Sequence, residues 1–128
     1  MNLASLGWTG VVGFAGALGA LTRYLLGRFI VVRFGSTFPW STLLINVTGA
    51  FLIGLFAGLT TAHMLAPVAQ TVLATGFLGG YTTFSTMSWE SVQLLRGGSV
   101  RQCIFYIGGT AMLGLLAAAL GLKLGGAF

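Results

Sequence analysis

Between Arg33 and Glu90 the chain has no charged side chain, apart from His63 when its imidazole is protonated. Soluble domains carry roughly a quarter charged residues, whereas only 5% of these 128 residues are charged, so the stretch belongs in a lipid bilayer. Glycines and hydroxyl residues nevertheless gather midway through it, at Gly79, Gly80, Tyr81, Thr82, Thr83, Phe84, Ser85 and Thr86. Freed backbone groups at membrane depth need partners in protein or in a solvated pathway, so this cluster predicts a broken helix that builds an ion site.

The hydrophobic pattern predicts an all-α membrane protein with a single transmembrane domain, residues 1–128. A chain of this length accommodates about four membrane helices of ~20 residues each. The expected helices are 3–26, 41–62, 68–95 with a break at 79–83, and 101–124. The short connections between them imply an antiparallel up-and-down order.

Several classes of function are excluded by what the chain lacks. One cysteine, Cys103, one histidine and one carboxylate, Glu90, cannot form a transition-metal site within a single chain. The same shortage leaves no second carboxylate for acid–base chemistry, so we expect no enzyme. The net charge of +5 comes from basic residues scattered at segment ends, which is typical of membrane boundaries rather than of a nucleic-acid surface.

Asn46 is the most polar side chain within the second segment. At helical spacing it shares one face with Thr42, Gly49 and Ile53. A buried amide is costly in hydrocarbon unless it is hydrogen-bonded. Asn46 therefore either makes an interhelical hydrogen bond that only supports packing, or serves as a neutral donor that faces a pore.

The hydroxyl-rich cluster of the third segment also admits two interpretations. Glycines favour non-helical backbone, and a break frees carbonyls that suit a cation and N–H groups that suit an anion. The alternative is a kink whose backbone groups are satisfied by Ser and Thr hydroxyls. Phe84 fits a lipid-facing or core position, or it directs the electropositive edge of its ring at an anion.

Other candidates lie on the fourth segment and near segment ends. Tyr106, Thr110 and Gly114 share a helical face, either as an interfacial anchor or as a polar rail that continues a pore. One interpretation of Arg23 and Glu90 is that both charged side chains extend to the lipid headgroups. The other interpretation concerns Arg23 alone, which would attract anions into a vestibule. Because the pore candidates are neutral donors, they favour a small anion over a cation.

Three strings make the chain resemble the Fluc or CrcB family of small bacterial fluoride channels. They are Gly19-Ala20-Leu21-Thr22-Arg23-Tyr24, Ser41-Thr42-Leu43-Leu44-Ile45-Asn46-Val47-Thr48-Gly49 and Thr75-Gly76-Phe77-Leu78-Gly79-Gly80-Tyr81-Thr82-Thr83-Phe84-Ser85-Thr86, followed by Glu90. The resemblance extends over the whole chain in length and number of segments, and the third string is the most specific.

The resemblance implies an antiparallel, dual-topology dimer in a bacterial plasma membrane, with two pores at its interface that export fluoride passively. It implies pore or supporting roles for a set of polar and aromatic residues: Asn46, Phe84, Thr42, Ser85, Tyr106 and Thr110. It also implies a structural Na⁺ on the dimer axis, bound by main-chain carbonyls of Gly79 and Thr82. A cation there would ease the passage of an anion.

Two features depart from the family pattern. The second pore phenylalanine is replaced by Met87, which fills space without an electropositive ring edge and predicts slower conduction. The basic residues also favour one side: Arg23, Arg28, Arg33, Arg96 and Arg101 against Lys123 and the terminal amine. This bias shrinks if Arg23 and Arg28 lie within the membrane or at vestibules; otherwise the chain pairs with an oppositely oriented relative.

Two other functions remain open from the sequence. A small proton-coupled multidrug exporter also has four helices, but it needs a carboxylate in the first segment, where this chain has none. A non-transporting assembly subunit would use the polar residues only to pack helices.

Overall fold

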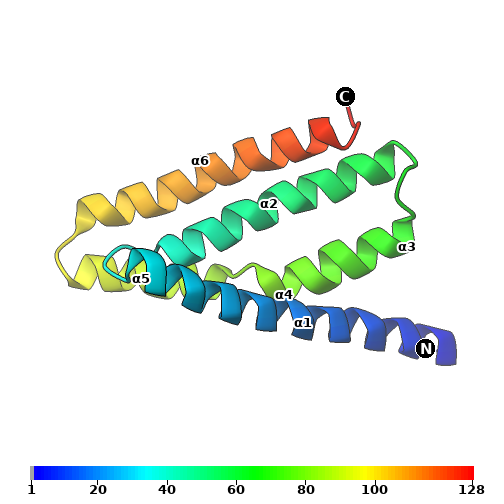
Figure 1. Ribbon diagram of the computed structural model, residues 1–128, viewed down its shortest axis with the longest axis horizontal. Helices are drawn as coiled ribbons and strands as arrows, with labels where there is room; N and C mark the ends of the chain where they lie inside the picture. The colour runs from blue at the N-terminus through cyan, green and yellow to red at the C-terminus, as the bar shows by residue number, and fades with distance from the viewer. Residues whose placement is uncertain (1) are drawn as a thin grey trace.

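The computed structural model describes residues 2–128, and every regular element in this range is a helix. The elements are α1 (Leu3–Phe34), α2 (Trp40–Thr61), α3 (Pro67–Gln70), the π-helix η1 (Thr71–Leu78), α4 (Gly79–Tyr81), α5 (Phe84–Arg96) and α6 (Val100–Leu124). Because α3, η1 and α4 follow one another directly, they form with α5 the third of four rows of helix (Figure 1). The prediction of an all-helical chain is confirmed, and the helices form the four expected segments.

The four rows run up and down, so the connections gather at two ends of the molecule. One end holds the α1–α2 and α5–α6 loops, and the other holds the α2–α3 loop and both termini (Figure 1). Helices α1, α2 and α6 are each long and apolar enough to cross a membrane. In the third row the interruption leaves no single helix of that length: α5 has 13 residues, whereas a span needs about 20.

Helix α1 is longer than the expected range of 3–26. It begins at an Asn2 cap, whose side-chain oxygen accepts a hydrogen bond from the Ser5 N–H at 2.8 Å, and continues to Phe34. Arg28 and Arg33 therefore belong to the helix rather than to a loop. Arginine is a good helix former, so a change in polarity does not by itself end a helix. Gly35, with φ at 80°, ends it.

Helices α2 and α6 pack through glycines on both partners. A Cβ atom at Gly54 would meet the Ala118 carbonyl, and one at Gly121 would meet the Phe51 carbonyl. Farther along, a Cβ on Gly58 would collide with Leu122. Because helices in lipid associate by close van der Waals packing, these contacts join α2 and α6 into one rigid pair.

Helix α1 approaches the third row in the same way. A Cβ atom at Gly19 would strike the Phe77 carbonyl, and one at Gly80 would strike the Gly16 carbonyl. Beside this contact lies a small buried core of Ile45, Leu78 and Tyr81. The closest packing of the third row therefore occurs immediately before its interruption.

Candidate functional site

The interruption of the third row falls at two residues. Thr82 (φ −80°, ψ 157°) and Thr83 (φ −148°, ψ 123°) are extended, and α5 begins at Phe84. The range expected from the sequence was 79–83, with the two glycines as its cause. Gly79 and Gly80 are instead helical. Gly80 is small because α1 packs against it, whereas no such contact accounts for Gly79.

Asn46 of α2 pairs with the backbone of Thr83. Its Oδ1 accepts a hydrogen bond from the Thr83 N–H at 2.9 Å, and its Nδ2 donates to the Thr83 carbonyl at 2.8 Å. The amide thus completes the hydrogen bonding of an extended residue that has no strand beside it. An amide nitrogen carries two N–H groups, so the second donor of Asn46 is not used in this pair. The two interpretations of Asn46 are compatible, since one side chain can stabilise the break and still offer a donor.

Thr83 also caps α5. Its Oγ1 accepts a hydrogen bond from the Thr86 N–H at 3.1 Å and donates to Thr86 Oγ1 at 3.0 Å. This cap satisfies one of the free N–H groups in the first turn of the helix. The first-turn amides of Phe84 and Ser85 have no such cap, and they form the positive end of the α5 dipole.

The residues that precede the break are fixed by α1 and α2. The Arg23 Nε donates to the Gly80 carbonyl at 3.1 Å, and the Tyr81 hydroxyl shares a hydrogen bond of 2.9 Å with Thr48. Gly49 has no room for a side chain, because a Cβ there would collide with Thr82. Both flanks of the interruption are therefore positioned by contacts distant in sequence.

The carbonyl groups at the break differ in their partners. The Leu78 carbonyl accepts hydrogen bonds from the N–H and the hydroxyl of Thr82 at 2.9 Å each. Within residues 2–128, no donor reaches the carbonyls of Gly79 or Thr82. Unpaired carbonyls of this kind coordinate Na⁺ in interrupted membrane helices, so these two oxygens fit the proposed ion.

One cavity, of about 290 Å³, lies alongside the break. Its lining residues come from α2, the interruption, α5 and α6: Asn46, Ala50, Ile53, Thr82, Thr83, Phe84, Met87 and Thr110. Four of the predicted pore residues are therefore brought together, and no charged residue lines the cavity. Phe84 is 76% exposed, so its ring extends from the surface of the single chain.

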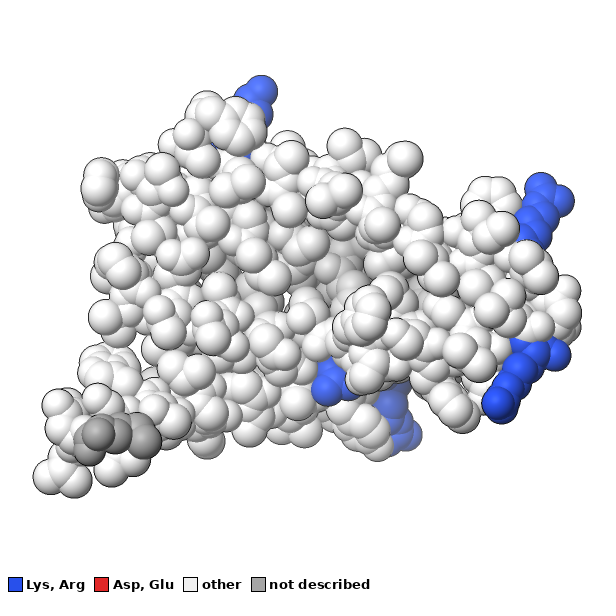
Figure 2. Space-filling model, turned by 180° about the vertical axis from the view of Figure 1, so that it is seen from behind, with Lys and Arg blue, Asp and Glu red and all other residues white. Residues whose placement is uncertain are grey.

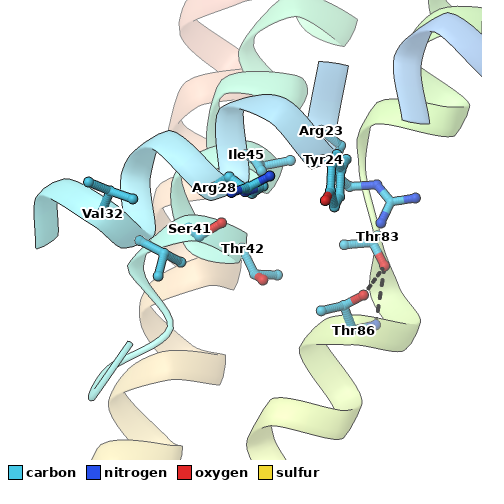
Figure 3. Close-up of a pocket in the computed structure, with 11 residues that line it drawn as sticks. Arg23, Tyr24, Arg28, Val32, Ser41, Thr42, Ile45, Thr83 and Thr86 are labelled. Atoms are coloured by element: carbon cyan, nitrogen blue, oxygen red, sulfur yellow. Dashed lines mark hydrogen bonds between the residues drawn. The ribbon is translucent and has the colours of Figure 1, made fainter. Parts of the chain in front are cut away.

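A second cavity, of about 380 Å³, lies between α1, α2 and the opposite side of the break. Arg23, Arg28, Thr42, Thr83 and Thr86 are among the residues that line it (Figure 3). The Arg28 guanidinium lies 5.9 Å from the centre of the Tyr24 ring. Two guanidinium groups and several hydroxyls make this space suitable for anions.

The remaining predicted residues lie elsewhere. Tyr106 is completely buried and donates a hydrogen bond to Glu90 Oε1 at 3.1 Å, so it supports Glu90 instead of lining a cavity described above. Glu90 lines a third cavity of about 210 Å³, with Ser36, Thr37 and Gln93. Arg23 and Glu90 therefore belong to separate spaces. Ser85 is exposed, and its Oγ lies 3.3 Å from Thr83 Oγ1.

Sequence reasoning missed two features of this site. No separate role was predicted for Thr83, although threonine is a common N-cap residue, whose side-chain oxygen accepts a hydrogen bond from the N–H three residues later. The π-helix η1 was also not expected, and its wider hydrogen-bonding pattern leaves no sequence signature of its own. Such helices frequently occur at functional sites.

The three apolar spans and the interrupted third row define the chain as a multi-pass helical membrane protein. Residues 10–122 match the family model described as "CrcB-like protein, Camphor Resistance (CrcB)". The chain belongs to the CrcB family, and the resemblance inferred from its sequence motifs is confirmed.

Relatives in several bacteria are similar over nearly their full length. The "Fluoride-specific ion channel FluC" of Thermus thermophilus is 49% identical, over 91% of this chain and 92% of the relative. The protein of the same name in Acidobacterium capsulatum is 45% identical, over 89% and 92%. The "Fluoride-specific ion channel FluC 1" of Listeria monocytogenes is 44% identical, over 90% and 94%.

Proposed function

We propose that this protein is a fluoride-selective channel that exports fluoride passively across the bacterial plasma membrane. The observation that carries the proposal is the cavity beside the break, where neutral donors meet the positive end of α5. The names of relatives at 44–49% identity support the same ion. As a channel, the protein performs no catalytic reaction.

The chemistry of the cavity suits a small, strongly hydrated anion. The free N–H of Asn46 and the first amides of α5 replace water as hydrogen-bond donors, whereas the Thr110 hydroxyl already donates to the Tyr106 carbonyl. The Phe84 ring adds an electropositive edge. No carboxylate or cationic side chain lines the cavity, so an anion is neither repelled nor held too firmly to leave. Met87 lacks a ring edge, and we expect conduction to be slower for that reason.

The open side of this cavity requires a second subunit. Phe84, Ser85 and Gly79 are exposed on the single chain, together with backbone groups that the interruption leaves free. Irregular backbone at membrane depth is tolerated only when protein or a water-filled path covers it. An antiparallel dimer with a pore along each side of its interface would provide that cover, with Tyr106 and Thr42 as supporting polar groups.

The structural Na⁺ would be bound by the carbonyls of Gly79 and Thr82, two from each subunit. Among the described residues, His, Cys, Asp and Glu form no cluster that could hold a metal, and carbonyl oxygens are ligands that suit Na⁺. Bound there, the ion would satisfy the unpaired carbonyls of the break and place a positive charge close to the path of the anion.

Ion flux from liposomes containing the purified protein tests the proposal. We expect fluoride to leave at least about tenfold faster than chloride and Phe84→Ile to slow fluoride by a similar factor. Thr9→Val, which changes a hydroxyl far from the break, is the matched control and should leave flux unchanged. Fluoride release no faster than from protein-free liposomes would contradict the proposal.

The same assay separates the other two functions. In an assembly subunit, Asn46→Asp and Phe84→Ile would weaken the dimer without affecting any flux. In a proton-coupled exporter, Glu90→Gln would abolish resistance to toxic cations, and fluoride would not cross. The apolar α1, which has no acidic residue, argues against the exporter.

Replacing Na⁺ with N-methylglucamine tests the cation separately. We expect the dimer to dissociate more readily in detergent, because the four carbonyls would lose their common partner. Dimer stability and flux that do not change between the two cations would exclude the sodium site while leaving the fluoride proposal intact.

A further inference from the structure

Helix α1 contacts Gly80 from two directions. A Cβ atom at Gly80 would collide with the Gly16 carbonyl and lie 3.1 Å from the Ala20 nitrogen. The Gly80 carbonyl also accepts a hydrogen bond from Arg23 Nε at 3.1 Å. These three residues of α1 follow one another at helical spacing, so a single face of α1 holds both the α-carbon and the carbonyl of Gly80.

The Gly80 carbonyl has lost its usual partner within the helix. In an unbroken helix it would accept a hydrogen bond from the N–H of Phe84, which lies beyond the extended residues Thr82 and Thr83. Figure 3 shows the Arg23 side chain extending from α1 to the third row, where its Nε takes the place of that N–H. Glycine has the greatest backbone freedom of any residue, and helix ends fray. Arg23 therefore restrains the residue of this turn that would otherwise move most.

The two carbonyls proposed to bind Na⁺ are connected through Gly80 and Tyr81. Helix α4 extends from Gly79 to Tyr81, and Thr82 leaves it with ψ at 157°. The direction of the Gly79 carbonyl relative to that of Thr82 is therefore set by the backbone angles of these few residues. Tyr81 is buried, and its hydroxyl is hydrogen-bonded to Thr48. Gly80 is consequently the position at which the two carbonyls would lose their arrangement most easily.

The charge of Arg23 has no acidic partner beside it. Glu90, the one acidic side chain of the sequence, lines a different cavity, and Figure 2 shows basic side chains but no acidic one on the face that it displays. The guanidinium stays protonated in proteins, and it lies at the carbonyl end of the first half of the third row, which is the negative end of the helix dipole. This charge would repel a Na⁺ bound at the same end. The hydrogen bond and the charge of Arg23 should therefore have opposite effects on cation binding.

We propose that Arg23 is a positioning residue for the cation site, and that its hydrogen bond to Gly80 outweighs its charge. The bond keeps α4 helical up to Tyr81, so the carbonyls of Gly79 and Thr82 keep the arrangement that a small cation needs. This inference rests on the proposed sodium site, and it adds to that site a residue of α1 that binds no ion itself.

Two neutral substitutions separate the hydrogen bond from the charge. In Arg23→Gln the amide nitrogen is as many bonds from the Cα atom as Nε is in arginine, so it can donate to the same carbonyl. Arg23→Met has a side chain of the same reach but no N–H donor. Both variants lose the charge, and a difference between them therefore reports the hydrogen bond alone.

The measurement is the fraction of dimer in detergent while NaCl replaces N-methylglucamine chloride at constant ionic strength. We expect the sodium concentration that gives half-maximal dimer to be at least about tenfold higher in Arg23→Met than in Arg23→Gln. Saturating sodium should restore the dimer of Arg23→Met, whereas a general loss of stability would lower the dimer fraction at every sodium concentration. Arg28→Met is the control, since it removes the guanidinium of the same cavity that lies over the Tyr24 ring. Its midpoint should stay within about twofold of the wild-type value.

Equal midpoints in Arg23→Gln and Arg23→Met would show that the hydrogen bond does not support the site, and a lower midpoint in Arg23→Met would show that the charge dominates. Either result overturns the proposal. If Arg23→Met does not fold, Arg23→Asn takes its place, because its amide ends one bond short of the Gly80 carbonyl and should raise the midpoint in the same way.

The wild-type protein separates this inference from the proposed sodium site. A wild-type dimer that does not respond to sodium would overturn both. A wild-type response to sodium without a difference between the two neutral variants would overturn the role of Arg23 alone. Fluoride flux does not enter these measurements, so the fluoride proposal is tested independently of them.

Discussion

The α2–α6 pair and the break between α4 and α5 are stabilised by different means. Along α2 and α6, backbone meets backbone through glycines, and the contact needs no polar side chain. At the break, the chain leaves the helix, and three side chains from other helices satisfy or position it: Asn46, Arg23 and Thr48. Close packing gives a pair that resists change, whereas a few hydrogen bonds give a segment whose polar groups remain available to an ion.

The largest effect should follow from disturbing the close packing. Gly121→Leu would place a side chain against the Phe51 carbonyl and separate α2 from α6. We expect the free energy of unfolding to fall by about 3 kcal/mol or more, so that little folded protein remains. Gly108→Ala in the same helix is the control, since a Cβ there meets no atom within 4 Å. Unfolding in sodium dodecyl sulfate, followed by circular dichroism, measures both. Equal stability of the two variants would mean that the glycine contacts are not needed.

The next effect should come from the break itself. Asn46→Ala leaves the N–H and carbonyl of Thr83 without their partner. Each of these groups that no water molecule reaches should lower the free energy of unfolding by about 1–3 kcal/mol. We therefore expect a lower free energy of unfolding together with loss of fluoride flux. Asn46→Gln, which keeps the amide but lengthens the side chain, should recover part of the stability and little of the flux. Wild-type stability in Asn46→Ala would show that water replaces the amide.

A smaller effect is expected from the hydroxyl that precedes the break. Tyr81→Phe removes the hydrogen bond with Thr48 but keeps the buried ring, and should cost about 0.5–1.5 kcal/mol. Thr48 retains its bonds to the carbonyls of Leu44 and Ile45, so its hydroxyl stays satisfied. Tyr24→Phe, at an exposed position, is the control in the same unfolding assay. A larger loss than in Asn46→Ala would reverse the order proposed here.

The smallest effect lies outside both regions and should be stabilising. His63 has φ at 60°, and it ends α2 in a motif in which the Met64 N–H reaches the Leu59 carbonyl at 2.9 Å. His63→Gly relieves the left-handed conformation at some cost in chain entropy, for a net gain of about 0.5–1 kcal/mol. Ala62→Gly, at a position with negative φ, should be destabilising instead. A loss of stability in His63→Gly would show that the imidazole makes compensating contacts.

The contrast between these regions also explains what the sequence could predict. Hydropathy located four segments, because the bilayer imposes length and polarity on each of them. It placed the end of the first at 26 instead of Phe34, since arginines continue a helix that has already left the hydrocarbon. The adjacent glycines predicted a break near the correct place, but the glycines are not its cause. Gly80 lacks a side chain because α1 packs against it, and the chain leaves the helix only at Thr82.

The site was predictable in its residue types but not in its pairings. The sequence indicates that Asn46 is polar and lies within a span, but the pairing with Thr83 depends on the register between α2 and the third row. The same holds for Tyr106, which was expected either as an interfacial anchor or as part of a polar rail along a pore, and which is buried and donates a hydrogen bond to Glu90. Periodicity defines the face of a helix, whereas the neighbour that meets that face is decided by packing.

The two halves of the third row differ in the helices that hold them: the first half is hydrogen-bonded to both α1 and α2, and the second half begins at a residue that is hydrogen-bonded to α2. Gly80, in the first half, receives the Arg23 guanidinium of α1, while Thr83, at the start of the second half, pairs with Asn46 of α2. Tyr81, directly after Gly80, shares a hydrogen bond with Thr48 of α2, so a lengthwise shift of α1 against α2 would break one of these two bonds or distort the turn that precedes the break. The last turn before Thr82 therefore couples the relative positions of α1 and α2 to the geometry of the interruption.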